Sequence, residues 1–372
     1  MVAKIYDYII VGGGSAGCIL ANRLSADPGL RVLLLEAGGS GRNPLYRVPL
    51  IAGKLSRNHF ADWNYETVPQ DGMAGRRVDW PRAKVLGGCS MVAGMLYVRG
   101  HPSDFDNWAQ LGCRGWSYRD VLPYFKRGED HEDGASAYHG GGGELRVRGP
   151  RSDNPILTAY IEAGRQAGYP LTDDFNGESQ EGFGRYHFNI KDGHRWSSAR
   201  AFLDPVRGRE NLTVLTGAHA TEILFEGTKA SGVAYRRRGS DQRARAEREV
   251  ILSGGAVNSP QLLMLSGIGP AQALGEHDIP VRADLAGVGR NLQDHLDLSV
   301  QHACTRPVTV FGLLVFDRFL AETARALLWG SGPATVFPQE AAGFVRSEPD
   351  LEVPDIQAHL LPLLAENMKL RP

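Results

Sequence analysis

The pattern of apolar and polar residues near the N-terminus predicts a strand, a turn and a helix in close succession. Residues 6–11 form a short apolar run of the kind found in a strand buried on both faces, and glycines follow at once. Residues 15–24 then carry small and apolar side chains at helical spacing, which predicts a helix. A second apolar run over 31–35 ends at Glu36 and predicts another strand. The order of these elements predicts an α/β fold.

The glycines between the first strand and the helix have the spacing of a dinucleotide-binding turn. Gly12 permits the tight turn, Gly14 lets a pyrophosphate approach the backbone, and Gly17 lets the helix pack closely on the strand. The free N–H groups at the start of the helix attract the anion. Glu36 lies 19 residues beyond Gly17, where an acidic residue that binds a ribose hydroxyl is expected. The alternative is a glycine turn in some other α/β protein.

This unit alone does not decide between the possible dinucleotides. NAD and FAD share the adenosine diphosphate half that such a turn binds, so both remain open. The carboxylate of Glu36 would repel the 2′-phosphate of NADP, which is therefore disfavoured.

Two later segments could also lie against a ligand. Residues 79–109, DWPRAKVLGGCSMVAGMLYVRGHPSDFDNWA, place Arg82 and Lys84 before a glycine turn and small residues that suit packing on a flat ligand. Residues 248–270, REVILSGGAVNSPQLLMLSGIGP, predict a strand that ends in two glycines and leads through Asn258 to Pro260 into a helix. Read alone, the first is more readily a cationic surface loop, and the second is equally a core strand and helix. Two further patterns predict a strand over 144–147 and an arginine-rich, solvated hairpin over 236–248.

Composition excludes several classes of protein. With 372 residues, 42% hydrophobic residues and a formal net charge of -1, the chain is typical of a globular protein of two or three domains that does not bind nucleic acid. The four cysteines stand far apart, which favours reduced thiols, and no histidine pair has a metal-ligand spacing, so we expect no metal. The uncharged stretch over 250–275 contains prolines and glycines and predicts strand, turn and helix rather than a membrane span. We expect a cytoplasmic protein without an export signal, with peripheral membrane contact left open.

Taken together and in this order, five segments resemble the glucose-methanol-choline (GMC) family of FAD-dependent oxidoreductases. They are DYIIVGGGSAGCILANRLS with VLLLEAGG, PRAKVLGG with GMLYVRG, GHRWSSARAFLDP, GGAVNSPQLLMLSGIGP and GVGRNLQDHL. Within the family they look most like the choline dehydrogenase and aliphatic alcohol dehydrogenase branch. The resemblance implies a Rossmann-like FAD-binding domain and a discontinuous α+β substrate domain. We place the former at 1–150 and 205–298 and the latter, incomplete, at 151–204 and 299–372.

The resemblance also implies which residues contact the cofactor. They are Gly12, Gly14, Ser15, Ala16, Gly17, Glu36, Ala37, Val85, Gly87, Gly88, Ser90, Ala93, Gly94, Met95 and Ala220. Three positions depart from the family: Cys89 and Met91 replace small hydroxyl residues, and Ala93 stands where Asn or His is usual. Because alanine cannot form the histidyl-flavin bond of some relatives, we expect noncovalent FAD.

The family's catalytic signature, a His-Pro followed by Gly-Thr and an Asn-x-Asn-x-Pro, has no counterpart in the sequence. A histidine accepts the hydroxyl proton while hydride passes to flavin N5, a task that suits an imidazole. His295 belongs to a landmark of the FAD domain, so we assign no catalytic residue. The resemblance implies that the C-terminal part of the family is missing, which would expose apolar surface and favour aggregation. Glu340 could face a cationic substrate such as choline, although an exposed or ion-paired role is favoured.

The leading hypothesis is an FAD-dependent oxidoreductase acting on the CH–OH group of primary alcohols, aliphatic alcohols or choline, with a quinone or other electron acceptor. The alternative is a truncated, catalytically inactive FAD-binding remnant of such an enzyme. A third, less favoured hypothesis is an NAD-dependent reductase that uses only the N-terminal unit. The sequence does not identify the alcohol, the acceptor or the oligomeric state.

Overall fold

The computed structural model describes residues 4–55, 61–363, 365–366 and 369–370. The chain forms two compact units, each assembled from three separate stretches of sequence. Unit 1 contains residues 1–42, 56–92 and 197–299, and unit 2 contains residues 43–55, 93–196 and 300–372.

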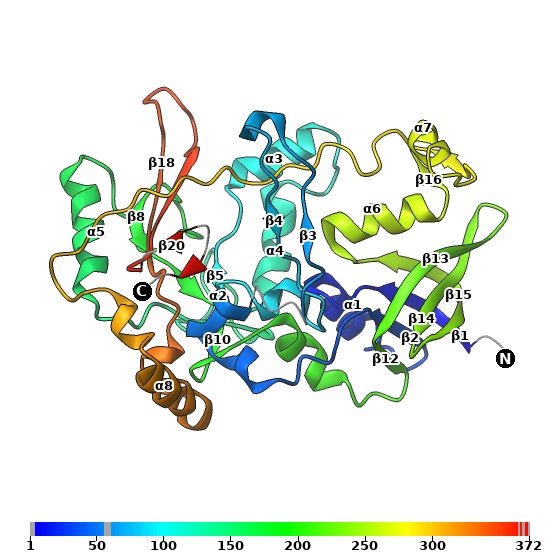
Figure 1. Ribbon diagram of the computed structural model, residues 1–372, viewed down its shortest axis with the longest axis horizontal. Helices are drawn as coiled ribbons and strands as arrows, with labels where there is room; N and C mark the ends of the chain where they lie inside the picture. The colour runs from blue at the N-terminus through cyan, green and yellow to red at the C-terminus, as the bar shows by residue number, and fades with distance from the viewer. Residues whose placement is uncertain (1–3, 56–60, 364, 367–368, 371–372) are drawn as a thin grey trace. The chain divides into compact units, whose positions relative to one another are not determined.

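A six-stranded sheet forms the centre of unit 1, with the strand order β12-β2-β1-β15-β14-β13 (Figure 1). The first four strands run parallel, and β14 and β13 extend the sheet in antiparallel pairing. The predicted strands over 6–11 and 31–35 are confirmed as β1 (Lys4–Val11) and β2 (Val32–Glu36). Ile9 and Ile10 are both fully buried. Because neighbouring side chains point to opposite faces, β1 is covered on both sides, as its apolar run predicts.

Two helices of unit 1 pack against this sheet. The predicted helix is confirmed as α1 (Ser15–Leu24), which contacts β1 and β2. The segment over 250–275 contains the end of β15 and then α6, which lies along β13 (Figure 1). The helix α6 (Gly255–Leu265) begins five residues before Pro260, earlier than predicted. Its second turn tolerates the proline, which removes one backbone hydrogen bond.

The arginine-rich segment over 236–248 is the predicted hairpin. It joins β14 (Lys229–Arg237) to β15 (Ser240–Leu252) through Arg238 and Gly239, which both have positive φ, +51° and +76°. A two-residue turn with two positive φ angles matches the twist of the strands that it connects. The remaining elements of unit 1 are β3 (Tyr65–Glu66), the 3₁₀ helix η4 (Asp71–Met73), β4 (Asp79–Trp80), the 3₁₀ helix η5 (Gly88–Met91), the π-helix η6 (Ala199–Leu203), the 3₁₀ helix η7 (Asp204–Val206), β12 (Leu212–Thr216), β13 (Ala218–Glu226), β16 (Ile268–Gly269), α7 (Ala271–Gly275) and β17 (Ala283–Asp284).

Unit 2 is an α+β arrangement around a three-stranded antiparallel sheet, β19-β18-β8. The central strand β18 (Ala341–Val345) is buried along its whole length, and α5 (Pro155–Gln166) packs on it and on β8 (Gly182–Arg185). Gly164 of α5 allows this approach, because a Cβ there would lie 2.3 Å from the ring of Phe183. The other helices and strands of unit 2 are α2 (Ala52–Leu55), β5 (Leu96–Tyr97), α3 (Pro102–Gln110), α4 (Tyr118–Gly128), β6 (Glu129–His131), β7 (Leu145–Val147, the predicted strand over 144–147), β9 (His187–Phe188), β10 (Ile190–Lys191), β11 (His194–Arg195), α8 (Phe316–Trp329), β19 (Ile356–Leu360), β20 (Ala365–Glu366) and β21 (Lys369–Leu370).

The boundaries of the two compact units differ from those of the two predicted domains. The sequence analysis assigned residues 93–150 to the FAD domain, and the structure places them in unit 2. The physical reason is strand pairing, since β5 pairs with β9 and sets Leu96 opposite Phe188. Compactness does not say what a unit binds. The assignment of FAD-binding and substrate domains therefore stays a prediction.

Candidate dinucleotide-binding site

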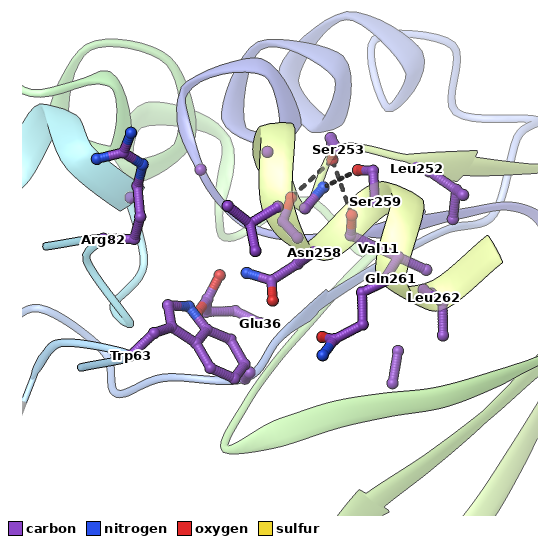
Figure 2. Close-up of a pocket in the computed structure, with 18 of the residues that line it drawn as sticks. Val11, Glu36, Trp63, Arg82, Leu252, Ser253, Asn258, Ser259, Gln261 and Leu262 are labelled. Atoms are coloured by element: carbon purple, nitrogen blue, oxygen red, sulfur yellow. Dashed lines mark hydrogen bonds between the residues drawn. The ribbon is translucent and has the colours of Figure 1, made fainter. Parts of the chain in front are cut away.

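A cavity of about 540 Å³ lies at the carboxyl ends of three parallel strands in unit 1. Val11, Glu36 and Leu252, at the ends of β1, β2 and β15, all line it (Figure 2). Ligands of open α/β sheets bind at this edge, outside the carboxyl ends of the strands. Eight residues predicted to contact the cofactor line the cavity: Gly12, Gly14, Ser15, Ala16, Glu36, Ala37, Gly88 and Ala220.

The three glycines of the first turn have different surroundings, as the spacing predicts. Gly12 has φ +102°, and a Cβ on it would lie 2.5 Å from the carbonyl oxygen of Ser253. A Cβ on Gly17 would lie 2.0 Å from the carbonyl oxygen of Gly12, so only glycine lets α1 pack this closely. Gly14 differs from both, because a Cβ there would meet nothing nearer than 3.9 Å. The fold therefore does not need glycine at position 14, although the close approach of a phosphate would.

Glu36 is positioned by the same turn. Its side chain accepts hydrogen bonds from the N–H groups of Gly13, at 2.8 Å, and Gly38, at 2.7 Å. The residue is only 6% exposed, and burial raises the pKa of its carboxyl group against the opposing effect of these two bonds. Each carboxylate oxygen accepts one backbone bond and keeps a second lone pair for a ribose hydroxyl.

The second glycine segment folds onto the first. The N–H of Gly87 donates to the carbonyl of Gly13 at 2.7 Å, and a Cβ on Gly88 would lie 2.8 Å from the Cα of Gly14. The hydroxyl of Ser90 donates to the carbonyl of Gly87 at 2.6 Å and accepts from the N–H of Ser198 at 3.0 Å. This loop therefore borders the cavity and belongs to the same site as the first turn.

The segment that follows β15 closes the cavity from the side of α6. The hydroxyl of Ser253 donates to the carbonyls of Gly12, at 2.8 Å, and Val11, at 3.1 Å (Figure 2). The hydroxyl of Ser259 accepts from the N–H of Gly254 at 3.0 Å. These bonds fix the start of α6 against the glycine turn. The end of β15 therefore lies at the cavity, where the sequence analysis predicted a ligand crevice.

Sequence reasoning missed an aromatic and polar wall of the cavity. Trp63 lines it beside His219, with the two rings 5.3 Å apart and edge to face, and the Lys84 Nζ lies 4.2 Å from the Trp63 ring centroid. Asn258 also lines the cavity (Figure 2). It accepts a hydrogen bond from the Tyr65 hydroxyl. The sequence analysis named Asn258 only for its position after a strand and did not predict its place in the cavity wall. Nothing in the local sequence marked Trp63, because β3 and β4 beside it are only two residues long.

The other seven residues predicted to contact the cofactor do not line the cavity. Four of them are in unit 1 but not in the cavity wall: Gly17, Val85, Gly87 and Ser90. Ala93, Gly94 and Met95 belong to unit 2, where a Cβ on Gly94 would lie 2.8 Å from the Phe337 ring and Met95 has φ +63°. The role of these three residues at a flavin stays a prediction.

Three further expectations concern groups outside this cavity. Glu340 is 1% exposed, lies 3.3 Å from Arg185 and accepts from the N–H groups of Arg151 and Ser152, so it is ion-paired and not exposed. Among the residues that the structure describes, no group of three His, Cys, Asp or Glu side chains is arranged to hold a metal ion. Within the same part of the chain, no helix has the length and apolar character needed to cross a membrane.

The cavity and its surroundings fit an FAD dinucleotide. An open glycine at the start of α1, a buried carboxylate at the end of β2 and a cavity of the size found for small-molecule and cofactor sites occur together. These residues would hold the adenosine diphosphate half of the molecule.

Comparisons with known proteins agree with this geometry. The family profile described as GMC oxidoreductase matches residues 6–297. Human choline dehydrogenase, mitochondrial, is 47% identical over 96% of the chain, and the chain spans 61% of that relative's length. Among solved structures, pyridoxine 4-oxidase from Mesorbium loti is 35% identical with a TM-score of 0.84 and covers 96% of this chain and 67% of its own. An FAD-dependent oxidoreductase from Chaetomium thermophilum is 30% identical with a TM-score of 0.81 and covers 91% of this chain and 61% of its own.

The match to the family profile extends over most of the sequence and includes every residue that lines the cavity. The chain belongs to the GMC oxidoreductases.

Proposed function

We propose that the unit 1 cavity binds the adenosine diphosphate half of FAD without a covalent bond. The diphosphate lies at the N-terminus of α1 against Gly14, and the ribose hydroxyls donate to Glu36. The observation that carries this proposal is the open space at Gly14, which the fold leaves free although the neighbouring glycines are tightly enclosed. The proposed contacts are those that the family resemblance implies, from Gly12 to Ala220, including Ala93, Gly94 and Met95 beside the flavin.

We further propose that the protein oxidises the CH–OH group of primary alcohols, either choline or aliphatic alcohols. A relative named choline dehydrogenase is 47% identical to the chain and supports this class of substrate. When bound, the flavin supplies the hydride acceptor at N5, and a quinone or another acceptor then takes the electrons. None of the chain's histidines stands in the signature that carries the family's base. We therefore expect these 372 residues to bind FAD and to need that signature for turnover. The cytoplasmic location and any peripheral membrane contact stay predictions.

The cofactor proposal is tested by titrating the chain with FAD and following the quenching of flavin fluorescence. The wild type should bind, and Gly14→Ala should weaken binding while it keeps the same thermal unfolding temperature. Gly208→Ala is the matched control, because a Cβ there meets nothing within 4 Å and the residue does not line the cavity. Equal affinity of the wild type and Gly14→Ala would contradict the proposal.

The activity proposal needs a second experiment. We expect choline or a primary aliphatic alcohol to bleach the flavin under anaerobic conditions only when a segment with the His and Asn signature is joined to the chain. The DNA downstream of the codon for Pro372 shows whether such a segment continues in frame. A stop or frameshift there would favour the inactive, FAD-binding remnant.

A further inference from the structure

A second cavity, of about 520 Å³, lies within unit 2, and every residue that lines it belongs to that unit. Leucines, valines and prolines, among them Leu50, Leu157 and Leu313, form much of its wall. Most of the polar wall comes from residues 148–154, which connect β7 to α5. A volume of this size is typical of a small-molecule site, and the mixed wall suits a ligand with an apolar body and a polar head.

Arg148 has no acidic partner, unlike its neighbour Arg151. Arg151 Nη2 lies 2.5 Å from Glu132 Oε2. Arg148 Nη2 donates to the carbonyl of Thr335 at 2.9 Å. Within the described part of the chain no carboxylate forms an ion pair with Arg148, and its buried Nε has no hydrogen-bond partner. A buried donor without an acceptor is unfavourable, and a ligand that accepts from it removes this cost.

The surrounding charges do not compensate Arg148 either. Burial, followed by the positive charge of Arg151, lowers the pKa of Arg148, and the opposing effects of Glu340 and Glu132 do not offset this change. Glu340 is paired with Arg185, 3.3 Å away, and with two backbone N–H groups. An anion bound beside Arg148 would stabilise its charged form. The cavity therefore favours a negatively charged head group.

Other groups of the polar wall favour the same charge. The Ser152 hydroxyl accepts from the N–H of Asn154 at 3.3 Å, and its own proton has no acceptor among the residues that the structure describes. Asn154 is the N-cap of α5, so the positive end of this helix dipole lies at the wall. Asp153 is the only acid in the described wall, and it is exposed to water, which screens its charge. An unused hydroxyl donor, a helix terminus and Arg148 thus meet at one wall.

We propose that this cavity is a binding site for a small organic carboxylate whose apolar body contains a few carbon atoms. The two carboxylate oxygens accept hydrogen bonds from the Arg148 guanidinium, whose planar fork matches them, and from the Ser152 hydroxyl. The apolar body packs on the leucines of the wall. A bare inorganic anion would leave this apolar surface uncovered, so it fits less well.

The backbone of Arg148 is already held in place without a ligand. The N–H of Arg148 donates to the carbonyl of Phe188 at 3.0 Å, and the N–H of Phe188 donates to the carbonyl of Arg148 at 2.8 Å. Little additional order is therefore needed for binding. The described walls of this cavity and of the unit 1 cavity share no residue, and the proposal does not depend on FAD.

The test measures the binding of hexanoate to the full chain by isothermal titration calorimetry, with and without FAD. Three comparison probes separate the parts of the ligand. Hexanamide has the same body without a charge, whereas acetate and inorganic phosphate have a charge without this body. Arg148→Gln removes the proposed partner of the carboxylate. Arg119→Gln is the matched control, because Arg119 is exposed on α4 and does not line the cavity.

We expect hexanoate to bind at least about tenfold more tightly than hexanamide, because hydrogen bonds between charged groups are stronger than those to a neutral amide. Hexanoate should also bind at least about tenfold more tightly than acetate or phosphate, since its body buries methylene groups. Arg119→Gln should bind hexanoate like the wild type, and Arg148→Gln at least about tenfold more weakly. Adding FAD should change none of these affinities. Wild-type affinity in Arg148→Gln, or equal binding of hexanoate and any comparison probe, would overturn the proposal.

A second variant keeps the test decisive if Arg148→Gln does not fold, since that change also removes the bond to Thr335. Ser152→Ala leaves Arg148 in place and should weaken hexanoate binding about three- to tenfold. Wild-type affinity in Ser152→Ala would then contradict the proposal. Displacement of hexanoate by FAD would place hexanoate in the unit 1 cavity instead and would equally overturn it.

Discussion

Single atoms decide what the glycine turn can do. Gly12 and Gly17 are enclosed by backbone oxygens at distances that no Cβ could occupy, whereas the space beside Gly14 is open. The first two glycines therefore serve the packing of strand and helix, and Gly14 is left for a ligand. The spacing predicts these separate roles, and the structure shows which of the three glycines the fold itself requires.

Replacing Gly17 by alanine should destabilise unit 1. In an open helix this change would be favourable by about 0.5 to 1 kcal/mol, but here the new methyl group would lie 2.0 Å from the Gly12 carbonyl oxygen. We expect a net loss of at least about 1 to 3 kcal/mol in the free energy of unfolding, measured by urea denaturation. Gly14→Ala is the control and should unfold at the wild-type midpoint. Equal stability of Gly17→Ala and the wild type would show that α1 and β1 are less closely packed than described.

Replacing Glu36 by glutamine should weaken nucleotide binding without unfolding the protein. The amide keeps one acceptor oxygen, so one of the backbone bonds from Gly13 and Gly38 is lost together with the charged partner of the ribose. Hydrogen bonds to charged groups contribute about 1.5 to 3 kcal/mol, which corresponds to a loss of affinity of about ten- to a hundredfold. Fluorescence titration with FAD and competition by AMP measure the change. Glu247→Gln, at an exposed position in the middle of β15 and outside the cavity wall, should bind like the wild type.

At the scale of elements, the sequence predicts best what is local. The helix α1 is found at its predicted bounds because its apolar spacing and the glycine turn before it are contiguous in the chain. The hairpin of β14 and β15 and the strand β7 are confirmed for the same reason. The start of α6 was misplaced because Pro260 was read as a helix start, although it lies inside the helix.

Features assembled from distant segments were beyond this kind of prediction. One such feature, the His139 ring, is a closed ring of hydrogen bonds among Arg99, Glu129, His139, Asp174 and Asn176. These residues come from four separate segments between 99 and 176, and no spacing in the sequence connects them. Trp63 enters the cavity from a loop without a recognisable element. The sequence around Glu340 was compatible with an exposed side chain. Only the fold brings Arg185 and two backbone N–H groups to its carboxylate.

The His139 ring should make folding stability depend on pH in a defined direction. Because the folded-state pKa of His139 is raised from 6.5 to about 9, its contribution is fully present below pH 6.5 and is lost as the pH rises through about 9. Thermal unfolding midpoints should therefore fall over that interval in the wild type. In His139→Gln the fall should be absent, and its stability at neutral pH should be lower by about 3 to 5 kcal/mol, since a buried pair has lost one partner. Parallel pH profiles of the two proteins would contradict this assignment.

The loss of folding stability at low pH should have a different cause. Burial and the charge of His139 hold the pKa values of His131 and His187 below 6.5, so these two groups bind protons more readily when the chain unfolds. Stability should therefore also fall as the pH drops below 6.5. The two effects together place the maximum stability of unit 2 near pH 6.5.

At the scale of the whole molecule, several large apolar side chains are exposed. Leu296 and Leu298 are 98% and 88% exposed, and Val300 follows at 74%. Such neighbouring apolar side chains on a surface favour association.

Replacing Leu296 and Leu298 together by glutamine should reduce self-association. The side chains make no core contacts, so the free energy of unfolding should change by no more than about 0.5 kcal/mol. Light scattering against protein concentration measures the effect. Replacing fully buried Leu203 by glutamine should instead unfold the protein. Unchanged scattering of the double variant would show that association involves another surface.

The most direct test of the account is the visible spectrum of the purified chain after incubation with FAD and removal of the unbound cofactor. We predict a flavin spectrum from the wild type, release of that flavin on denaturation because no covalent bond holds it, and a much weaker spectrum from folded Gly14→Ala. A folded wild-type chain that retains no flavin, or a Gly14→Ala variant that retains as much as the wild type, would contradict the claim that the turn before α1 holds the cofactor.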